Sequence, residues 1–202
     1  MEAAVSKGLD ANKLGQRISF FFNAHNGFIE EIAKFRAARK MWALIMKKRF
    51  KVTNEKAMMC RFHTQTGGST LTSEQPSNNI VRTTIQAMSA VLGGTQSLHT
   101  NGFDEALSLP SDDSAKLALR TQQIIAYETN ISKYPDPFGG SYLIENMTND
   151  FIDDSLKIID EIDKIGGALE AIESGWVENQ ISRSAYEYLS LIHISEPTRP
   201  VL

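Results

Sequence analysis

Three short runs of β-branched and aromatic residues stand out along the chain, and each of them ends in polar side chains. They span residues 17–25, 58–66 and 94–102, and the third is assigned from its position between helices rather than from its composition. Short apolar runs with polar ends are typical of strands. The pattern therefore predicts three strands that recur about every 35 to 40 residues.

Helical patterns separate these strands. A helix is expected after a cap at Asn26, and a second helix is expected over about 77–92, where Gly93 stops it. The first helix should place Ile32, Phe35, Ala38, Trp42 and Ile45 on one face, and the second Val81, Ile85, Met88 and Leu92. This alternation of strand and helix indicates a parallel sheet with right-handed crossovers.

After residue 103 the pattern is helical. Ser111 is expected to cap a helix that runs to about Glu128, a second helix should begin at Thr148, and a third should fill 168–187. The helix that begins at Thr148 should place Ile152, Leu156, Ile159 and Ile162 on one face and end at Gly166. The predicted fold class is therefore α/β, a partial (β/α)8 TIM barrel of about three parallel strands with their helices, followed by a helical C-terminal part.

The final stretch, LSLIHISEPTRPVL at 189–202, departs from this pattern. It resembles the translated read-through of a sequencing adapter, so it is excluded from the reasoning about the fold. A genuine flexible tail is the alternative interpretation. The expected organisation is one partial barrel domain over 1–188 and a non-native tail over 189–202.

Composition narrows the functional classes. The chain has 202 residues, of which 42% are hydrophobic and 22% charged, as in ordinary globular proteins. A net charge of -3 argues against nucleic acid as a partner, and no apolar run approaches membrane-spanning length. Cys60 is the only cysteine, and the N-terminus has charges where a signal peptide would be apolar. These features favour a cytoplasmic location without disulfides.

Three histidines mark the candidate site. His25, His63 and His99 each fall at the C-terminal end of a predicted strand, beside amides and hydroxyls. In parallel α/β folds ligands bind at this edge, because the loops that follow the strands converge there. A structural, hydrogen-bonded role is open for each histidine, and so is a three-histidine metal site. The residues predict a polar site at the strand ends but do not name a reaction.

Longer segments resemble a known family. Residues 61–110, which include RFHTQTGGSTLTSEQP and SLHTNGFDEALSLP, are similar to the large-chain catalytic domain of the methylmalonyl-CoA mutase family and its sister acyl-CoA mutases. Segments 20–43, 118–129 and 136–148 resemble the same domain. The resemblance extends over about residues 15–187.

The resemblance implies a (β/α)8 barrel whose axis is threaded by the pantetheine arm of an acyl-CoA substrate. It also implies an intramolecular transferase that uses adenosylcobalamin for a radical 1,2-rearrangement of the methylmalonyl-CoA to succinyl-CoA type. The cofactor would be carried by a cobalamin-binding domain or small subunit, within a homo- or hetero-oligomer. No nucleic acid or membrane partner is implied.

The resemblance also assigns residues. His63 matches the histidine that hydrogen-bonds the thioester carbonyl oxygen and is the expected catalytic residue. Gln65 is expected to line the substrate site, and Gly102, Phe103 and Asp104 match positions along the path of coenzyme A. His25 and His99 remain lining or structural residues, and no residue is assigned to a metal or to the cofactor.

Other features of the family are absent from the sequence. No DxHxxG motif occurs, so the lower axial histidine of the cobalamin is not expected in this chain. A complete barrel needs about 250 residues. The chain is therefore expected to be a fragment that is inactive by itself. The alternatives are the large chain of an isobutyryl-CoA or 2-hydroxyisobutyryl-CoA mutase, and a non-catalytic barrel fragment that acts as an interaction partner.

Overall fold

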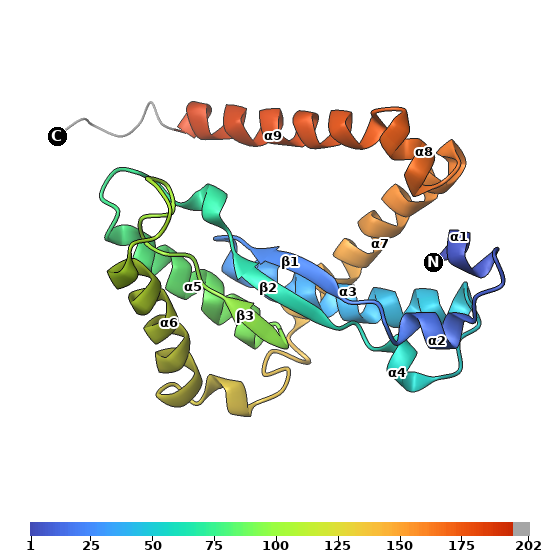
Figure 1. The fold of residues 1–202 in the computed structure, drawn as a ribbon, viewed down its shortest axis with the longest axis horizontal. Coiled ribbons are helices and arrows are strands. Elements are labelled where there is room, and N and C mark those ends of the chain that lie inside the picture. The colour runs from blue at the N-terminus through green and yellow to red at the C-terminus, as the bar shows by residue number, and fades with distance from the viewer. Residues whose placement is uncertain (196–202) are drawn as a thin grey trace. The chain divides into compact units, whose positions relative to one another are not determined.

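The computed structural model describes residues 1–195, with the side chains of 1–188 (Figure 1). Two compact units divide the chain, one over 1–152 and the other over 153–202, and the boundary falls inside a long helix. The predicted tail at 189–202 is not tested, since 196–202 lie outside the described residues and 189–195 are described only as helical backbone. Among the described residues, no helix has both the length and the apolar character needed to cross a bilayer.

The first unit contains a parallel sheet in the order β1-β2-β3, and this confirms the predicted α/β fold class. The strands are β1 (Phe20–Ala24), β2 (Phe62–Thr66) and β3 (Ser97–His99). Each is shorter than predicted. Met58, predicted as the first residue of the second strand, instead ends a helical turn over 55–58, which Asn54 caps by accepting a hydrogen bond from the Lys56 N–H. Figure 1 shows the three strands side by side.

Helices follow the strands in the predicted order. The first unit contains α1 (Glu2–Val5), α2 (Ala11–Gly15), α3 (Phe28–Lys48), α4 (Glu55–Met58), η1 (Gly68–Thr70), α5 (Asn78–Leu92), α6 (Asp112–Tyr127), η2 (Ile131–Lys133) and the first part of α7 (Tyr142–Ile165). The second unit contains the rest of α7, α8 (Ala168–Glu173) and α9 (Trp176–Ser195).

Several helix boundaries differ from the prediction. The N-cap of α3 is Gly27, because the Asn26 amide bonds to α5 instead. Helix α7 begins at Tyr142, six residues before the predicted start at Thr148. The prediction of a single helix over 168–187 was wrong. The helix is interrupted at Gly175, whose φ of 74° is left-handed. The cap of α6 at Ser111 is confirmed, with its hydroxyl accepting from the Ser114 N–H.

The core lies on one face of the sheet. Phe62 of β2 stacks on Phe35 of α3, with ring centroids 5.3 Å apart and an interplanar angle of 11°. Ala24, Cys60 and Ala90 complete the buried cluster. Burial raises the pKa of the Cys60 thiol to about 11, so it remains protonated at neutral pH.

The apolar face predicted for α5 is wrong. Val81 and Ile85 are 59% and 40% exposed. The buried side of the helix instead has small and polar residues, namely Asn79, Thr83, Gln86, Ala87, Ser89 and Ala90. Small side chains let the helix approach the sheet closely, and the amides on this face bond to the loops that follow the strands.

The two faces of the sheet should respond differently to the loss of an aromatic ring. Phe35→Ala removes a ring that is 0% exposed and should lower the free energy of unfolding by about 3–5 kcal/mol. Phe21→Ala, on the opposite face of the sheet where the ring is 61% exposed, should change it by only about 0.5 kcal/mol. Urea denaturation of both variants measures the difference, and equal losses would contradict this assignment of the core.

Candidate functional site

The second face of the sheet has an ordered set of polar groups. Along β2 the side chains alternate, so Phe62, Thr64 and Thr66 are buried toward the helices while His63 and Gln65 are only half-buried on the other face. The strand register aligns Phe21, His63 and Ser97 in one row across the sheet and Asn23, Gln65 and His99 in the next. We call these two rows the His63 row and the Gln65 row.

The position of His63 differs from the prediction. It is the second residue of β2 and not a residue at its C-terminal end, because the strand begins only at Phe62. His99 is the last residue of β3, and His25 directly follows β1, as predicted. The three histidines therefore lie at three successive levels along the strands. Among the described residues, no group of three or more His, Cys, Asp or Glu side chains could hold a metal ion.

Two neighbours in its own row contact the His63 ring. The Nδ1 atom lies 2.7 Å from the Ser97 hydroxyl oxygen on β3. The ring centroid lies 5.2 Å from that of Phe21 on β1, with a tilt of 44°. The ring thus has a hydrogen-bonding group on one side and an aromatic ring on the other, while Nε2 has no protein partner among the described residues.

Gln65 is tied to the loop after β3. Its amide Nε2 donates to Asn101 Oδ1 at 3.0 Å, and the Asn101 N–H donates to Thr66 Oγ1 at 2.9 Å. Asn101 is buried, and its Nδ2 has no hydrogen-bond partner among the described residues. Sequence reasoning had placed Gln65 in the site without a partner, and the structure supplies Asn101.

Gly102, Phe103 and Asp104 lie in the loop after β3, where contacts to α5 and to the start of α6 hold them. Both oxygens of the Asp104 carboxylate accept hydrogen bonds, one from the Ser111 N–H and hydroxyl and the other from the Ser114 hydroxyl at 2.5 Å. A Cβ atom at Gly102 would lie 2.8 Å from this carboxylate, so only glycine fits there. The carbonyl of Phe103 accepts from Asn79 at 2.9 Å. The assignment of these three residues to a ligand path remains a prediction.

The Asp104 contacts imply a pH effect on stability. The Ser111 N–H, followed by the Ser114 hydroxyl, lowers the pKa of Asp104 below its ordinary value of 3.8. The unfolded chain then binds this proton more readily than the folded chain, so the stabilisation is complete above about pH 4 and falls as the pH decreases. Asp104→Asn should destabilise the chain at neutral pH and reduce this acid dependence.

Urea midpoints measured from neutral to acidic pH test this expectation. Asp113→Asn is the matched control, since Asp113 is an exposed carboxylate in the first turn of α6, the helix to which Asp104 is bonded. An unchanged acid dependence in Asp104→Asn would contradict the role of these contacts.

Two buried amides of α5 hold the loops around the site, and sequence reasoning missed both. Gln86 Oε1 accepts from the Gly67 N–H at 2.9 Å, and its Nε2 donates to Asn26 Oδ1 and Thr70 Oγ1, both at 2.6 Å. It therefore joins the loops after β1 and β2. Both Asn79 and Gln86 are 0% exposed.

Asn79 makes the corresponding connection between the loops after β2 and β3. Its amide pairs with the backbone N–H and carbonyl of Thr72, at 3.1 and 2.8 Å, and donates to the Phe103 carbonyl. The sequence did contain a signal for both residues. Asn79, Thr83, Gln86 and Ala90 recur at spacings of four, three and four, which marks one helix face as clearly as the apolar pattern does.

Gln86→Met keeps the size of the side chain and removes all of its hydrogen bonds. It should lower the free energy of unfolding by about 1–3 kcal/mol, because buried polar groups in two loops lose their partner. Amide hydrogen exchange over 67–72 should accelerate more than exchange in α3. Gln180→Met, at an exposed position of α9, is the control and should change neither quantity. Equal effects of the two substitutions would contradict the proposed role of Gln86.

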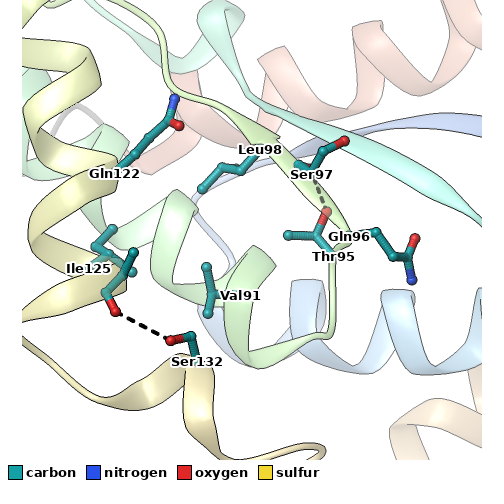
Figure 2. A pocket seen from close by; sticks show the side chains of 9 residues that line it. Val91, Thr95, Gln96, Ser97, Leu98, Gln122, Ile125 and Ser132 are labelled. Atoms are coloured by element: carbon teal, nitrogen blue, oxygen red, sulfur yellow. Dashed lines mark hydrogen bonds between the residues drawn. The ribbon is translucent and has the colours of Figure 1, made fainter.

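A cavity of about 240 Å³ lies on the helix side of β3 (Figure 2). Val91, Leu98 and Ile125 contribute apolar walls. With the amide of Gln122 oriented to match its neighbours, it donates to the Leu98 carbonyl at 3.3 Å and accepts from the Thr100 N–H at 3.2 Å. The Gln122 amide thus pairs with backbone groups at the outer edge of β3 and just after it. Ser97, which pairs with His63 on the other face, also lines this cavity, so the cavity borders the candidate site at β3.

Comparisons with known proteins identify relatives of the chain. A family model described as methylmalonyl-CoA mutase matches residues 1–198. The large subunit of 2-hydroxyisobutanoyl-CoA mutase from Aquincola tertiaricarbonis is 49% identical over 180 residues, which are 89% of this chain and 32% of that protein. Human mitochondrial methylmalonyl-CoA mutase is 49% identical over 178 residues, 88% of this chain and 24% of that protein.

A bacterial methylmalonyl-CoA mutase, from Rhizobium meliloti, is 45% identical over 185 residues, 92% of this chain and 26% of that protein. The chain therefore spans about a quarter to a third of the length of the curated relatives that it matches.

Proposed function

Because the chain belongs to the methylmalonyl-CoA mutase family, we propose that it forms the thioester-binding part of an acyl-CoA mutase, an intramolecular transferase. The reaction would be a radical 1,2-rearrangement of a CoA thioester. The observation that carries this proposal is His63, whose half-buried ring has Nδ1 held by Ser97 and its plane against Phe21, while Nε2 has no partner among the described residues.

His63 is proposed to donate a hydrogen bond from Nε2 to the thioester carbonyl oxygen. Electron density on that oxygen increases as the acyl group rearranges, so a donor placed beforehand stabilises the transition state more than the ground state. The half-buried position strengthens this effect, because a hydrogen bond shielded from water is electrostatically stronger. The imidazole needs to transfer no proton in this role.

The Gln65 row extends the site along the strands. Gln65 lies on the same face as His63, two residues further along β2, and its amide is oriented by Asn101. We propose that it lines the acyl-CoA path. Gly102, Phe103 and Asp104 are proposed to shape the same path through the loop after β3, with the Asp104 carboxylate holding the loop to α6.

The family implies a B12 cofactor, proposed here to be adenosylcobalamin, but the residues of this chain do not fit the lower ligand of its cobalt. The DxHxxG motif is absent from the sequence. His25 and His99, at the C-terminal strand ends, have no carboxylate or hydroxyl partner among the described residues, whereas a metal-binding histidine usually has its second nitrogen oriented by one. We therefore assign the cofactor to a cobalamin-binding domain or small subunit that assembles with this chain as an oligomer.

The acyl group is left open between two types. The relative named for 2-hydroxyisobutanoyl-CoA and the human relative named for methylmalonyl-CoA are each 49% identical to this chain, so overall identity does not separate these substrates. Both are branched acyl thioesters of coenzyme A, and the role proposed for His63 applies equally to each. The cytoplasmic location remains a prediction from the sequence.

Thioester binding tests the proposal directly. Methylmalonyl-CoA and 2-hydroxyisobutanoyl-CoA should each shift the ring resonances of His63 in this chain. Free coenzyme A, which lacks the thioester carbonyl, should not. His63 resonances that respond equally to free coenzyme A, or to none of the three, would contradict the proposed contact.

Turnover provides a second test. In a catalytically complete mutase that contains this chain, His63→Ala should lower kcat by about 10²–10³, the usual cost of losing one such donor, with a much smaller change in KM. His63→Gln, which keeps an N–H donor, should recover part of the loss. An unchanged kcat in His63→Ala would show that the residue has no part in the chemical step.

A further inference from the structure

The segment that joins α6 to α7 has little apolar burial of its own. It spans residues 128–141, which we call the strap, and it lies entirely within the first unit. Ile131 and Phe138 are half-buried, while the other residues of the strap are exposed. Its short helical turn, η2, packs against α5 and α6. With so few buried apolar groups, the position of the strap depends on its polar contacts.

The hydrogen bonds of the strap are local, with a single exception. Its backbone and hydroxyl groups bond to residues no more than six positions away in the chain, as in the bond from Ser132 Oγ to the Ala126 carbonyl. Within the part of the chain that the structure describes, only the Asp136 carboxylate bonds to a distant residue, and that residue is Arg36 of α3. Local bonds shape the strap, but they do not attach it to α3.

Arg36 binds Asp136 through two nitrogens of its guanidinium group. Nε donates to one carboxylate oxygen at 2.7 Å, and Nη2 donates to the other at 3.1 Å. The same guanidinium donates to Glu145 at 2.7 Å and to Thr148 at 3.1 Å, both on α7. The Arg36 side chain is 12% exposed and the Asp136 side chain 44%. The arginine is therefore held by α7 with or without the strap, and Asp136 is the partner that can leave.

The backbone at Asp136 is strained in this attached position. Its φ of 46° is left-handed, whereas a residue that precedes a proline, here Pro137, prefers extended backbone. Aspartate tolerates left-handed backbone better than most residues, but such a conformation persists only where the surrounding structure holds it. The two bonds to Arg36 supply this hold, so the backbone can relax once they break.

The strap also forms part of the wall of the cavity on the helix side of β3. Ser132 of η2 lines this cavity together with Val91 of α5 and Ile125 of α6 (Figure 2). Ile125 is only 3% exposed, although its neighbours Ile124 and Ala126 are exposed. Moving the strap away would remove Ser132 from the wall and expose the apolar side chains behind it to solvent.

We propose that the strap is a lid on this cavity and that the Arg36–Asp136 pair is the latch that keeps it closed. When the pair breaks, the strain at Asp136 is released and the strap moves away, while α6 and α7 stay in place. The open form exposes an apolar cavity of about 240 Å³ next to β3. This device does not depend on the proposed function, because it involves neither a thioester nor His63.

Cysteine labelling measures the opening of the strap in the 202-residue chain. Ile125→Cys places a thiol on the cavity wall, where N-ethylmaleimide can reach it only when the strap is open. Cys60, the one natural cysteine, is buried in the core and reports global unfolding in the same sample. The ratio of the two labelling rates, measured by mass spectrometry of the peptides, separates opening of the strap from loss of the whole fold.

Two further substitutions in the Ile125→Cys chain test the latch. Arg36→Met removes it and should accelerate labelling at position 125 about tenfold, the effect of losing an ion-paired hydrogen bond, with a much smaller change at Cys60. Asp136→Asn keeps a residue that tolerates left-handed backbone and should accelerate labelling by a smaller factor. Asp150→Asn, at an exposed carboxylate of α7, is the matched control and should change neither rate.

Amide hydrogen exchange over 129–141 provides a second measurement, made with Ile125 in place so that it does not rely on the introduced thiol. Exchange in the strap should accelerate in Arg36→Met and Asp136→Asn more than exchange in α5. If Arg36→Met failed to fold, Asp136→Asn would still decide the question, since it leaves the bonds from Arg36 to α7 intact.

Labelling at position 125 that stays unchanged in both variants would overturn the proposal. Equal acceleration at position 125 and at Cys60 would also overturn it, because a pair that only stabilised the whole fold would give that result. Rapid labelling of Ile125→Cys with the latch intact would show that the strap does not cover the cavity.

Discussion

The stacking of Phe62 on Phe35 determines which way the sheet faces, and the candidate site depends on that orientation. Side chains along a strand alternate between the two faces, so burying Phe62 beneath α3 turns its neighbour His63 to the opposite side. A shift of one residue in this strand would bury the histidine and expose the aromatic ring. The energetics of the core and the placement of the candidate catalytic group are therefore set by the same contact.

The inward side of α5 shows a second constraint. This helix buries amides and small side chains and leaves Val81 and Ile85 exposed, contrary to the usual amphipathic arrangement. Buried amides have to be hydrogen-bonded, and Gln86 and Asn79 satisfy this requirement by bonding to the loops after all three strands. The helix loses some apolar burial, and the loops around the site gain fixed positions.

Membership of the methylmalonyl-CoA mutase family and the geometry of the sheet support the same interpretation of the site. The family supplies the class of chemistry, and the structure supplies an imidazole with one nitrogen held by a hydroxyl and the other without a partner in the part of the chain that it describes. A single hydrogen-bond donor stabilises a transition state only modestly. It is effective only when its ring is held still, which is why the neighbours of His63 matter as much as the residue itself.

The sequence by itself determined the order of the strands and the helices between them, the α/β class, the resemblance to the family and the prediction of His63 as the catalytic residue. Those features follow from local periodicity and from long similar segments. The tertiary structure decided the level of His63 on its strand, its pairing with Ser97, the loops that Gln86 joins and the exposure of Val81 and Ile85. These depend on strand register and on contacts between residues far apart in the chain, which a local pattern of hydrophobic and polar positions does not specify.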